Sequence, residues 1–124
     1  GENSSQVNTM KPTIEFFAGI PEELSDVSLR SYRDTSDKII LMKFQTLRCL
    51  DRFKSFTKSS SNIIHLKDEE GDITIAPSAT RLIFGGPEGD DMKGVEVEFE
   101  IHQSDHLERF MRFMDRYAQA NNMA

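Results

Sequence analysis

The chain has 124 residues, enough for one folded domain. Its 21 acidic residues outnumber its 15 basic ones, and the formal net charge of -6 argues against electrostatic binding of nucleic acid or anionic lipid as its main purpose. The single cysteine, Cys49, argues against a disulfide framework and against a zinc site built from thiolates, and we expect it to be a buried structural thiol.

The N-terminal residues are almost wholly polar, so we expect a flexible lead over residues 1–10 and a single domain over 11–124. No apolar run approaches the roughly twenty residues that a membrane-spanning helix needs. Any contact with a membrane is therefore expected to be peripheral.

The first half of the domain has the periodicity of strands followed by a helix. Strands are predicted over 13–18, 27–33 and 38–44, the last of them central because it is apolar on both faces. The next apolar residues recur at helical spacing, which predicts a short amphipathic helix over 47–56.

The second half begins with two predicted strands, 63–67 and 72–76, joined by an acidic turn into a hairpin. A short strand over 80–84 and a glycine-rich loop over 85–94 follow. Residues 95–101 alternate between apolar and acidic side chains, so we expect one face of this strand to lie in the core. The other face carries a row of acidic side chains, Glu96, Glu98 and Glu100.

The C-terminal segment 105–121 is the clearest predicted helix, with an apolar stripe at i, i+3, i+4 and i+7 and with Asp105 as N-cap paired with Glu108. Together these elements predict an α+β fold, a mainly antiparallel twisted sheet with a short middle helix and a long C-terminal helix packed on one face.

No catalytic or metal-binding constellation can be named from these residues. His102 and His106 are close in sequence, but the predicted strand-to-helix boundary lies between them and a metal site needs a third ligand. The acidic turn lacks the ligand spacing of a calcium loop, and the glycine-rich loop lacks the ending of a phosphate loop. We therefore predict no catalytic, cofactor-binding or metal-binding residue and expect an interaction module.

Two features can serve such a module. The predicted helix carries a basic stripe formed by Arg109, Arg112 and Arg116. We consider three roles for this stripe: ion pairs with Glu108 and Asp115 on the same helix, contact with an acidic partner, or a solvated surface without a binding role. An open sheet edge can accept an extended peptide through main-chain hydrogen bonds, or it can pair with its own copy.

Residues 109–118, Arg-Phe-Met-Arg-Phe-Met-Asp-Arg-Tyr-Ala, resemble the C-terminal signature of the Psb28 family, assembly factors of photosystem II. Further matches to the family, in its order, are Ile14 to Phe16 with Gly19, Val27 to Leu29 through Arg33 and Asp34, Asp68 to Ile73, and Phe84 through Glu88. The chain departs from the family at Leu107, where tryptophan is common, at Asn121 and Asn122, where a glycine usually ends the helix, and over 46–62. It looks like the divergent second type of the family.

The resemblance implies a non-catalytic protein without a cofactor, peripheral on the cytoplasmic or stromal face of the thylakoid membrane. Such a protein associates transiently with photosystem II assembly intermediates, near the D1 and D2 subunits and the core antenna protein CP47, whose C-terminal tail adds a strand to the sheet. It protects the unfinished reaction centre by altering the acceptor side around the secondary quinone. We expect Arg33, Arg109, Arg112 and Arg116 to contact the partner or to position the fold.

Two alternatives stay open. One is an enzyme or small-ligand or metal-binding domain that uses the acidic strand with His102 and His106, and a deep pocket joining Glu98, Glu100 and His106 would favour it. The other is a self-associating module, so we expect either a monomer or a weak homodimer.

Overall fold

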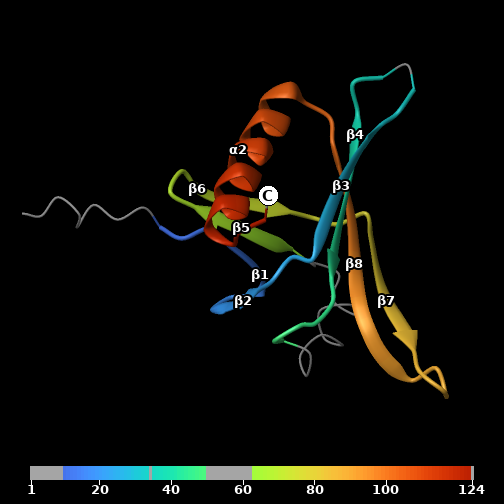
Figure 1. Cartoon of the computed structure of the whole chain (residues 1–124). Helices are drawn as coiled ribbons and strands as arrows, with labels where there is room; N and C mark the ends of the chain where they lie inside the picture. The colour runs from blue at the N-terminus through green and yellow to red at the C-terminus, as the bar shows by residue number, and fades with distance from the viewer. Residues whose placement is uncertain (1–9, 34, 50–62, 124) are drawn as a thin grey trace, which may run out of the picture.

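The computed structural model describes residues 10–33, 35–49 and 63–123, and its elements form two antiparallel sheets and a C-terminal helix (Figure 1). The first sheet has the order β2-β1-β5-β6, with β1 (Thr13–Phe17), β2 (Ile20–Glu22), β5 (Ile64–Asp68) and β6 (Gly71–Ile75). The second has the order β3-β4-β8-β7, with β3 (Asp26–Ser31), β4 (Lys38–Phe44), β7 (Ala79–Gly85) and β8 (Asp91–Ile101). The predicted α+β class with a mostly antiparallel sheet is confirmed.

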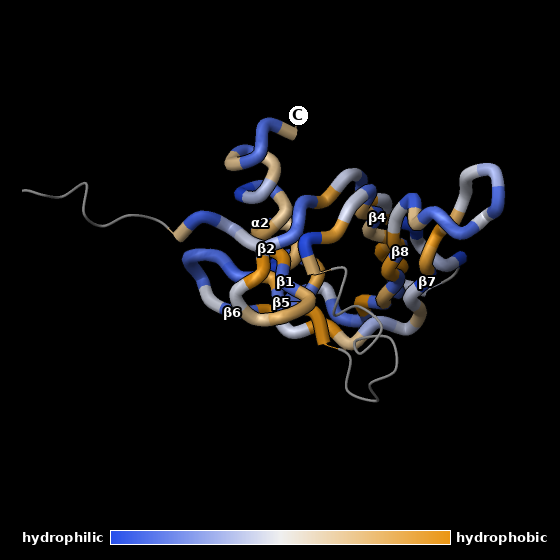
Figure 2. Tube along the Cα trace, turned by 90° about the horizontal axis from the view of Figure 1, so that it is seen from below, coloured by the Kyte–Doolittle hydropathy of each residue, from blue (hydrophilic) through white to orange (hydrophobic). Residues whose placement is uncertain are grey.

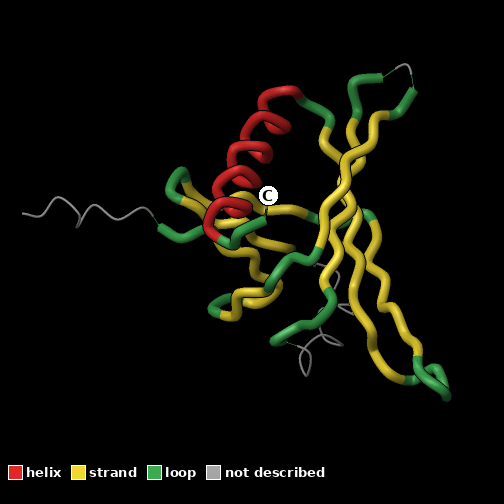
Figure 3. The backbone as a smooth tube through the Cα atoms, viewed as in Figure 1, coloured by secondary structure: helices red, strands yellow, loops and turns green. Residues whose placement is uncertain are grey.

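Helix α2 (Ser104–Ala120) covers one side of this arrangement, as Figure 3 shows. It buries Phe110, Phe113, Met114 and Tyr117. The stripe predicted from the sequence includes Phe110, Met114 and Tyr117, but it also includes Met111, which is 44% exposed, and it misses Phe113, which is fully buried. Phe99 of β8 meets Phe110 edge-to-face with ring centroids 5.6 Å apart, which joins the helix to the second sheet. The helix therefore closes the core.

The two sheets share one hydrophobic core. Phe16 of β1 and Phe44 of β4 contact edge-to-face across the sheets, with ring centroids 5.1 Å apart. Both rings are buried, as are the apolar side chains of β5 and β8 around them. In Figure 2 the hydrophobic stretches lie on the strands, while the long turns are largely hydrophilic. Burial of these side chains from both sheets holds the layers together.

The structure confirms the predicted strands and corrects details of them. Strand β4 lies inside its sheet, but only one face is fully buried, because Ile40 and Met42 are buried and Ile39 and Leu41 are partly exposed. The predicted loop 85–94 was too long, since β8 already begins at Asp91. The short strand β2 was not predicted, because three residues that contain a proline carry no alternation.

Gly94 explains why the beginning of β8 was read as a loop. A Cβ atom at this position would lie 2.7 Å from the carbonyl oxygen of Phe44, so only glycine lets β8 approach β4 here. By contrast, Gly86 and Gly89 have φ angles of 87° and 71° and serve the β7–β8 turn itself. A glycine required by close strand packing and a glycine required by a turn therefore cannot be distinguished in the sequence.

Two helix predictions need correction. Residues Leu47 to Cys49 form a loop and turn, not the start of a helix, and the remainder of the predicted helix, 50–56, lies outside the described residues, as does nearly all of the predicted lead. The N-cap of α2 is Gln103 without a side-chain cap bond, and not Asp105. Asp105 lies in the first turn, where its carboxylate still favours the helix dipole.

The C-terminal end of α2 shows why the chain can lack a terminal glycine. Asn122 has a φ of 58°, the left-handed conformation that a glycine usually supplies at this position. The N–H of Met123 donates to the carbonyl of Ala118 over 2.8 Å, as in a Schellman motif. Asparagine tolerates this conformation better than most residues, so the helix ends as it would with glycine.

Candidate functional site

The arginine stripe of α2 lies against the turn between β5 and β6. Arg109 makes a two-pronged contact with the carboxylate of Asp68, at 2.9 and 2.6 Å, and also donates to the carbonyl of Gly71. Arg116 adds a hydrogen bond of 2.9 Å to the same carboxylate. Asp68 is fully buried, so two guanidinium groups compensate one buried charge.

Glu70 in the same turn extends this network. Its carboxylate accepts hydrogen bonds from Arg112 at 2.8 and 3.0 Å and from Arg116 at 2.6 Å. These bonds lower the pKa of Glu70 to about 2. Burial by itself would raise the pKa of Asp68, but the hydrogen bonds from Arg109 and Arg116 outweigh it and lower this pKa to about 2. Both carboxylates are ionised at neutral pH.

The arginine stripe of α2 binds other acids than the two that the sequence suggests. The sequence offers Glu108 and Asp115 as neighbours on the helix, whereas the arginines reach acids about 40 residues earlier in the chain. The side chain of Arg109 is 20% exposed and that of Arg112 is 50% exposed. The stripe thus joins the helix to the hairpin, and Arg112 is its most accessible member.

Arg33 lies apart from this network. It follows β3 in the turn that leads to β4, and it is exposed. It makes no hydrogen bond or ion pair with any residue that the structure describes. The structure therefore does not bring the four predicted arginines together.

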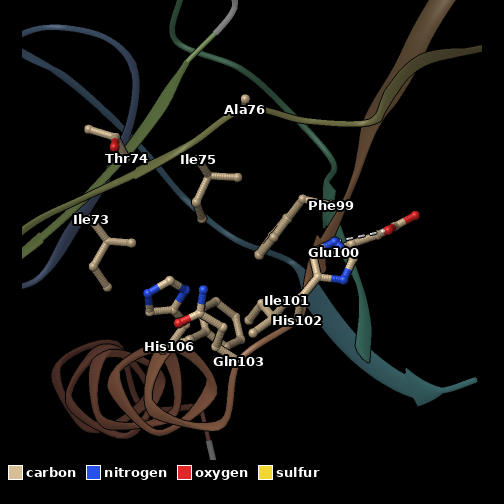
Figure 4. Close-up of a pocket in the computed structure, with 11 residues that line it drawn as sticks. Ile73, Thr74, Ile75, Ala76, Phe99, Glu100, Ile101, His102, Gln103 and His106 are labelled. Atoms are coloured by element: carbon tan, nitrogen blue, oxygen red, sulfur yellow. Dashed lines mark ion pairs between the residues drawn. The ribbon is translucent and has the colours of Figure 1, made fainter. Parts of the chain in front are cut away.

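A groove of about 500 Å³ lies between β6 and the junction of β8 with α2 (Figure 4). Its lining includes five large apolar side chains, so much of its surface is apolar: Ile73, Ile75, Phe99, Ile101 and Phe110. His106 points into the groove beside Ile73, and His102 lies at its far end. This is the place that the small-ligand alternative requires.

The charged groups near the groove are held by neighbours. His102 contacts Asp37 at 3.0 Å and Glu100 at 3.4 Å, and the hydrogen bond to Asp37 raises its pKa. Glu98 does not line the groove and pairs instead with Arg81, so the three groups named by the alternative do not converge. No cluster of three metal-binding side chains occurs within 10–33, 35–49 and 63–123.

Glu22 and Tyr117 form a second buried polar site that the sequence did not reveal. The carboxylate of Glu22 accepts the backbone N–H groups of Arg48 and Cys49 at 2.7 and 3.0 Å. The Tyr117 hydroxyl accepts the N–H of Leu24 at 3.0 Å, which ties α2 to the segment after β2. Cys49 is buried as predicted. These contacts hold the backbone and offer no accessible reactive group.

The remaining candidate is an open sheet edge, and two of the four edge strands have features that protect an edge. Strand β2 has three residues, one of them Pro21. Strand β7 has a register shift between Ile83 and Phe84. Strand β6 has a regular register, and it borders the groove, with the first turn of α2 opposite. Short length, proline and bulges are the usual protections of an edge.

Strand β3 lacks these protections. It pairs with β4 over six consecutive residues without a register shift, and five of the six are exposed. The N–H of Tyr32 donates to Asp37, which fixes the alternation of the ladder. Val27, Leu29 and Ser31 therefore direct their N–H and C=O groups away from β4. The alternation of this strand was visible in the sequence, but its place at an edge was not.

No helix among the described residues has the length and apolar character to cross a membrane.

The family model described as Psb28 protein matches residues 14–124. A relative from Pyropia yezoensis named photosystem II reaction center Psb28 protein is 35% identical over 112 residues, covering 90% of this chain and 92% of its own. Proteins of the same name from Guillardia theta and Acaryochloris marina are 30% and 27% identical, covering 90% and 92% of this chain and 91% and 96% of their own. The chain belongs to the Psb28 family.

Proposed function

We propose that this protein is a non-catalytic assembly factor that binds photosystem II intermediates transiently and protects the immature reaction centre. The relatives carry the name of the photosystem II reaction centre, and their similarity spans nearly the whole folded part of the chain. We place its action at the cytoplasmic or stromal face of the thylakoid membrane. The expected partners are D1, D2 and the core antenna protein CP47.

The regular, exposed edge of β3 supports strand addition as the mode of binding. An extended partner segment, in the first place the C-terminal tail of CP47, would pair with the outward N–H and C=O groups of Val27, Leu29 and Ser31. Leu29 is 41% exposed and offers an apolar contact beside the new strand. This mechanism requires no cofactor and no net positive charge.

Affinity capture from solubilised thylakoid membranes tests the proposal, with Leu29→Pro as the decisive variant. Proline removes an N–H that faces away from β4, so the β3–β4 ladder is kept while the acceptor edge is interrupted. We expect the wild type to recover CP47, D1 and D2 and the variant to recover at least about tenfold less. Phe84→Ser on the opposite edge is the control and should capture normally. Recovery of no photosystem II subunit by the wild type would overturn the proposal.

A peptide titration tests the edge without relying on the proline variant. A synthetic peptide with the sequence of the CP47 tail is added to ¹⁵N-labelled protein, and amide shifts are followed by NMR. We expect the largest changes at Val27, Leu29 and Ser31. Changes confined to β7 or to the groove would refute addition at β3, although the role in assembly would stand if capture succeeds.

Among the arginines, we assign partner contact to Arg33 and Arg112 and positioning of the helix to Arg109 and Arg116. The first two are exposed, whereas the other two hold the buried Asp68. Arg33→Glu should weaken capture. Lys93→Glu changes the net charge equally at an exposed position of β8 and should not weaken it. Equal capture by both variants would remove Arg33 from the contact surface.

The groove keeps the small-ligand alternative testable, because His102, His106 and Glu100 are among the residues that line it. Thermal unfolding in the presence and absence of Zn²⁺ distinguishes the two functions. We expect no shift of the midpoint. A stabilisation that disappears in His106→Ala would favour a metal-binding role over strand addition alone.

A further inference from the structure

His102 lies at the junction of β8 with α2, and each nitrogen of its ring meets a carboxylate. Its Nδ1 is 3.0 Å from Asp37, and its Nε2 is 3.4 Å from Glu100, the contact drawn in Figure 4. A neutral imidazole has one N–H and one lone pair, so only the protonated ring can donate to both acids. The arrangement is therefore complementary to the charged form of His102.

The register of the second sheet shows what this contact joins. Lys38 of β4 pairs with Ile101 of β8, so the next residues outward on these two strands, Asp37 and His102, are neighbours. On its other side, Asp37 accepts the N–H of Tyr32, the first residue after β3, at its carbonyl over 3.2 Å. Asp37 thus holds the end of the edge strand through its backbone and the β8–α2 junction through its side chain.

The other bonds of the β3–β4 turn stay within the hairpin. Thr35 donates its N–H to the carbonyl of Tyr32 over 3.4 Å, and its hydroxyl accepts the N–H of Asp37 over 3.2 Å. Among the described residues of this turn, the contact of Asp37 with His102 is the only hydrogen bond or ion pair that reaches beyond β3 and β4. Loss of that contact would therefore release the turn from the rest of the sheet.

Four further titratable groups lie on the elements around the ring without an ion pair to it: Arg30 of β3, Lys38 of β4, and Asp105 and His106 of α2. Lys38 donates instead to the hydroxyl of Ser31 over 2.9 Å, so it neutralises neither acid. The hydrogen bond to Asp37 and the charges of Asp37 and Glu100 raise the pKa of His102 above its ordinary value of 6.5. The contact therefore stabilises the fold below pH 6.5 and is lost as the pH rises through the raised pKa.

We propose that His102 is a pH-sensitive latch that holds the β3–β4 turn, and with it the end of β3, against the β8–α2 junction. When the ring loses its proton, one nitrogen presents a lone pair to a carboxylate and the turn is released. The side chain is 58% exposed, so its proton exchanges directly with water. The latch regulates the edge that the proposed function gives to a partner strand. Its effect on binding rests on that proposal, whereas the latch itself does not.

An NMR titration of the full chain from about pH 5.5 to about pH 9 tests the latch. The imidazole signals of His102 and the backbone amide signals of Tyr32 and Thr35 are followed in the same samples. We expect the two amides to shift with the midpoint of His102, because Asp37 connects them to the ring. Amide signals that do not follow the titration of His102 would overturn the proposal.

A pair of acid-to-amide variants identifies the contact that matters. Asp37→Asn removes the charge from the turn, so it should move the midpoint of His102 to lower pH and remove this midpoint from the Tyr32 amide. Asp26→Asn removes the same charge at the opposite end of β3 and should leave the midpoint unchanged. The dispersion of the amide signals shows whether each variant is folded. An unchanged midpoint in Asp37→Asn, or an equal shift in both variants, would refute the latch.

The effect on binding is measured with the synthetic peptide of the CP47 tail at about pH 6 and about pH 8. His102→Gln keeps a neutral donor but cannot titrate. We expect the Kd of the wild type to rise at least about threefold between the two pH values and that of His102→Gln to change less than about 1.5-fold. An equal rise in both proteins would disprove the coupling to β3. A peptide that binds at neither pH would refute strand addition, and the amide titration then decides on the latch.

Discussion

The charged residues at the α2 end of the molecule differ from those at the β3 edge in what they contact. Around the β5–β6 turn, Asp68 and Glu70 are held by three arginines, and Asp68 is removed from water. On β3, by contrast, Asp26 and Arg30 are exposed and contact no other described side chain through an ion pair. The basic stripe of α2, which suggested binding in the sequence, therefore pairs mainly within the protein. The exposed charges that remain available to a partner lie on the edge strand β3.

Loss of the core beneath the helix should have the largest effect. Phe113 is fully buried and stacks on Tyr117 with ring centroids 5.9 Å apart. Phe113→Ala should lower the free energy of unfolding by about 3–5 kcal/mol, because it removes buried apolar surface and leaves a cavity. Urea unfolding measures this change. Met111→Ala, on the exposed side of α2, is the control and should cost less than about 0.5 kcal/mol. Equal losses would mean that the helix register is wrong.

Removal of the buried charge tests the α2 end directly. Asp68→Asn should destabilise the protein by about 3 kcal/mol, because Arg109 and Arg116 lose the carboxylate that compensates them. The measurement is again urea unfolding at pH 7. Asp72→Asn changes an exposed carboxylate that contacts His65 and should cost less than about 1 kcal/mol. A loss near zero for Asp68→Asn would show that the network is not structural.

Acid should weaken the same region. The pKa of Asp68 falls from 3.8 to about 2 on folding, so its ionised form stabilises the native state above pH 3.8. This stabilisation, about 2 kcal/mol, is lost as the pH falls through about 2. Unfolding free energies measured from pH 6 to pH 2 should decline more steeply in the wild type than in Asp68→Asn. Parallel curves would contradict the assignment.

The smallest effect is expected at the rim of the network. Arg112 is half-exposed and bonds Glu70, which lies at the surface. Arg112→Ala should change the free energy of unfolding by less than about 1 kcal/mol, since exposed ion pairs contribute little. The same variant should be tested in capture, where a clear loss would confirm partner contact. A loss of several kcal/mol would instead place Arg112 in the structural part of the network.

Several elements could be predicted because their signal is local. The alternation of β8, the apolar stripe of α2 and the acidic turn of the β5–β6 hairpin each depend on residues close in sequence. The resemblance to Psb28 proteins also lies in short motifs, and the match over residues 14–124 confirms it. The left-handed conformation of Asn122 was not predicted, because the asparagine pair was noted only as a departure from the glycine usual at this position.

Periodicity and motif by themselves determined the fold class, most of the strands, the terminal helix and the family, because each depends on side chains within one or two turns or strands. The tertiary structure decided the division into two sheets, the partners of the arginines and the edge position of β3. These depend on contacts between residues that are far apart in the chain, such as Asp68 with Arg109. A local pattern shows which face of a strand is apolar, but only packing decides which edge stays open to water.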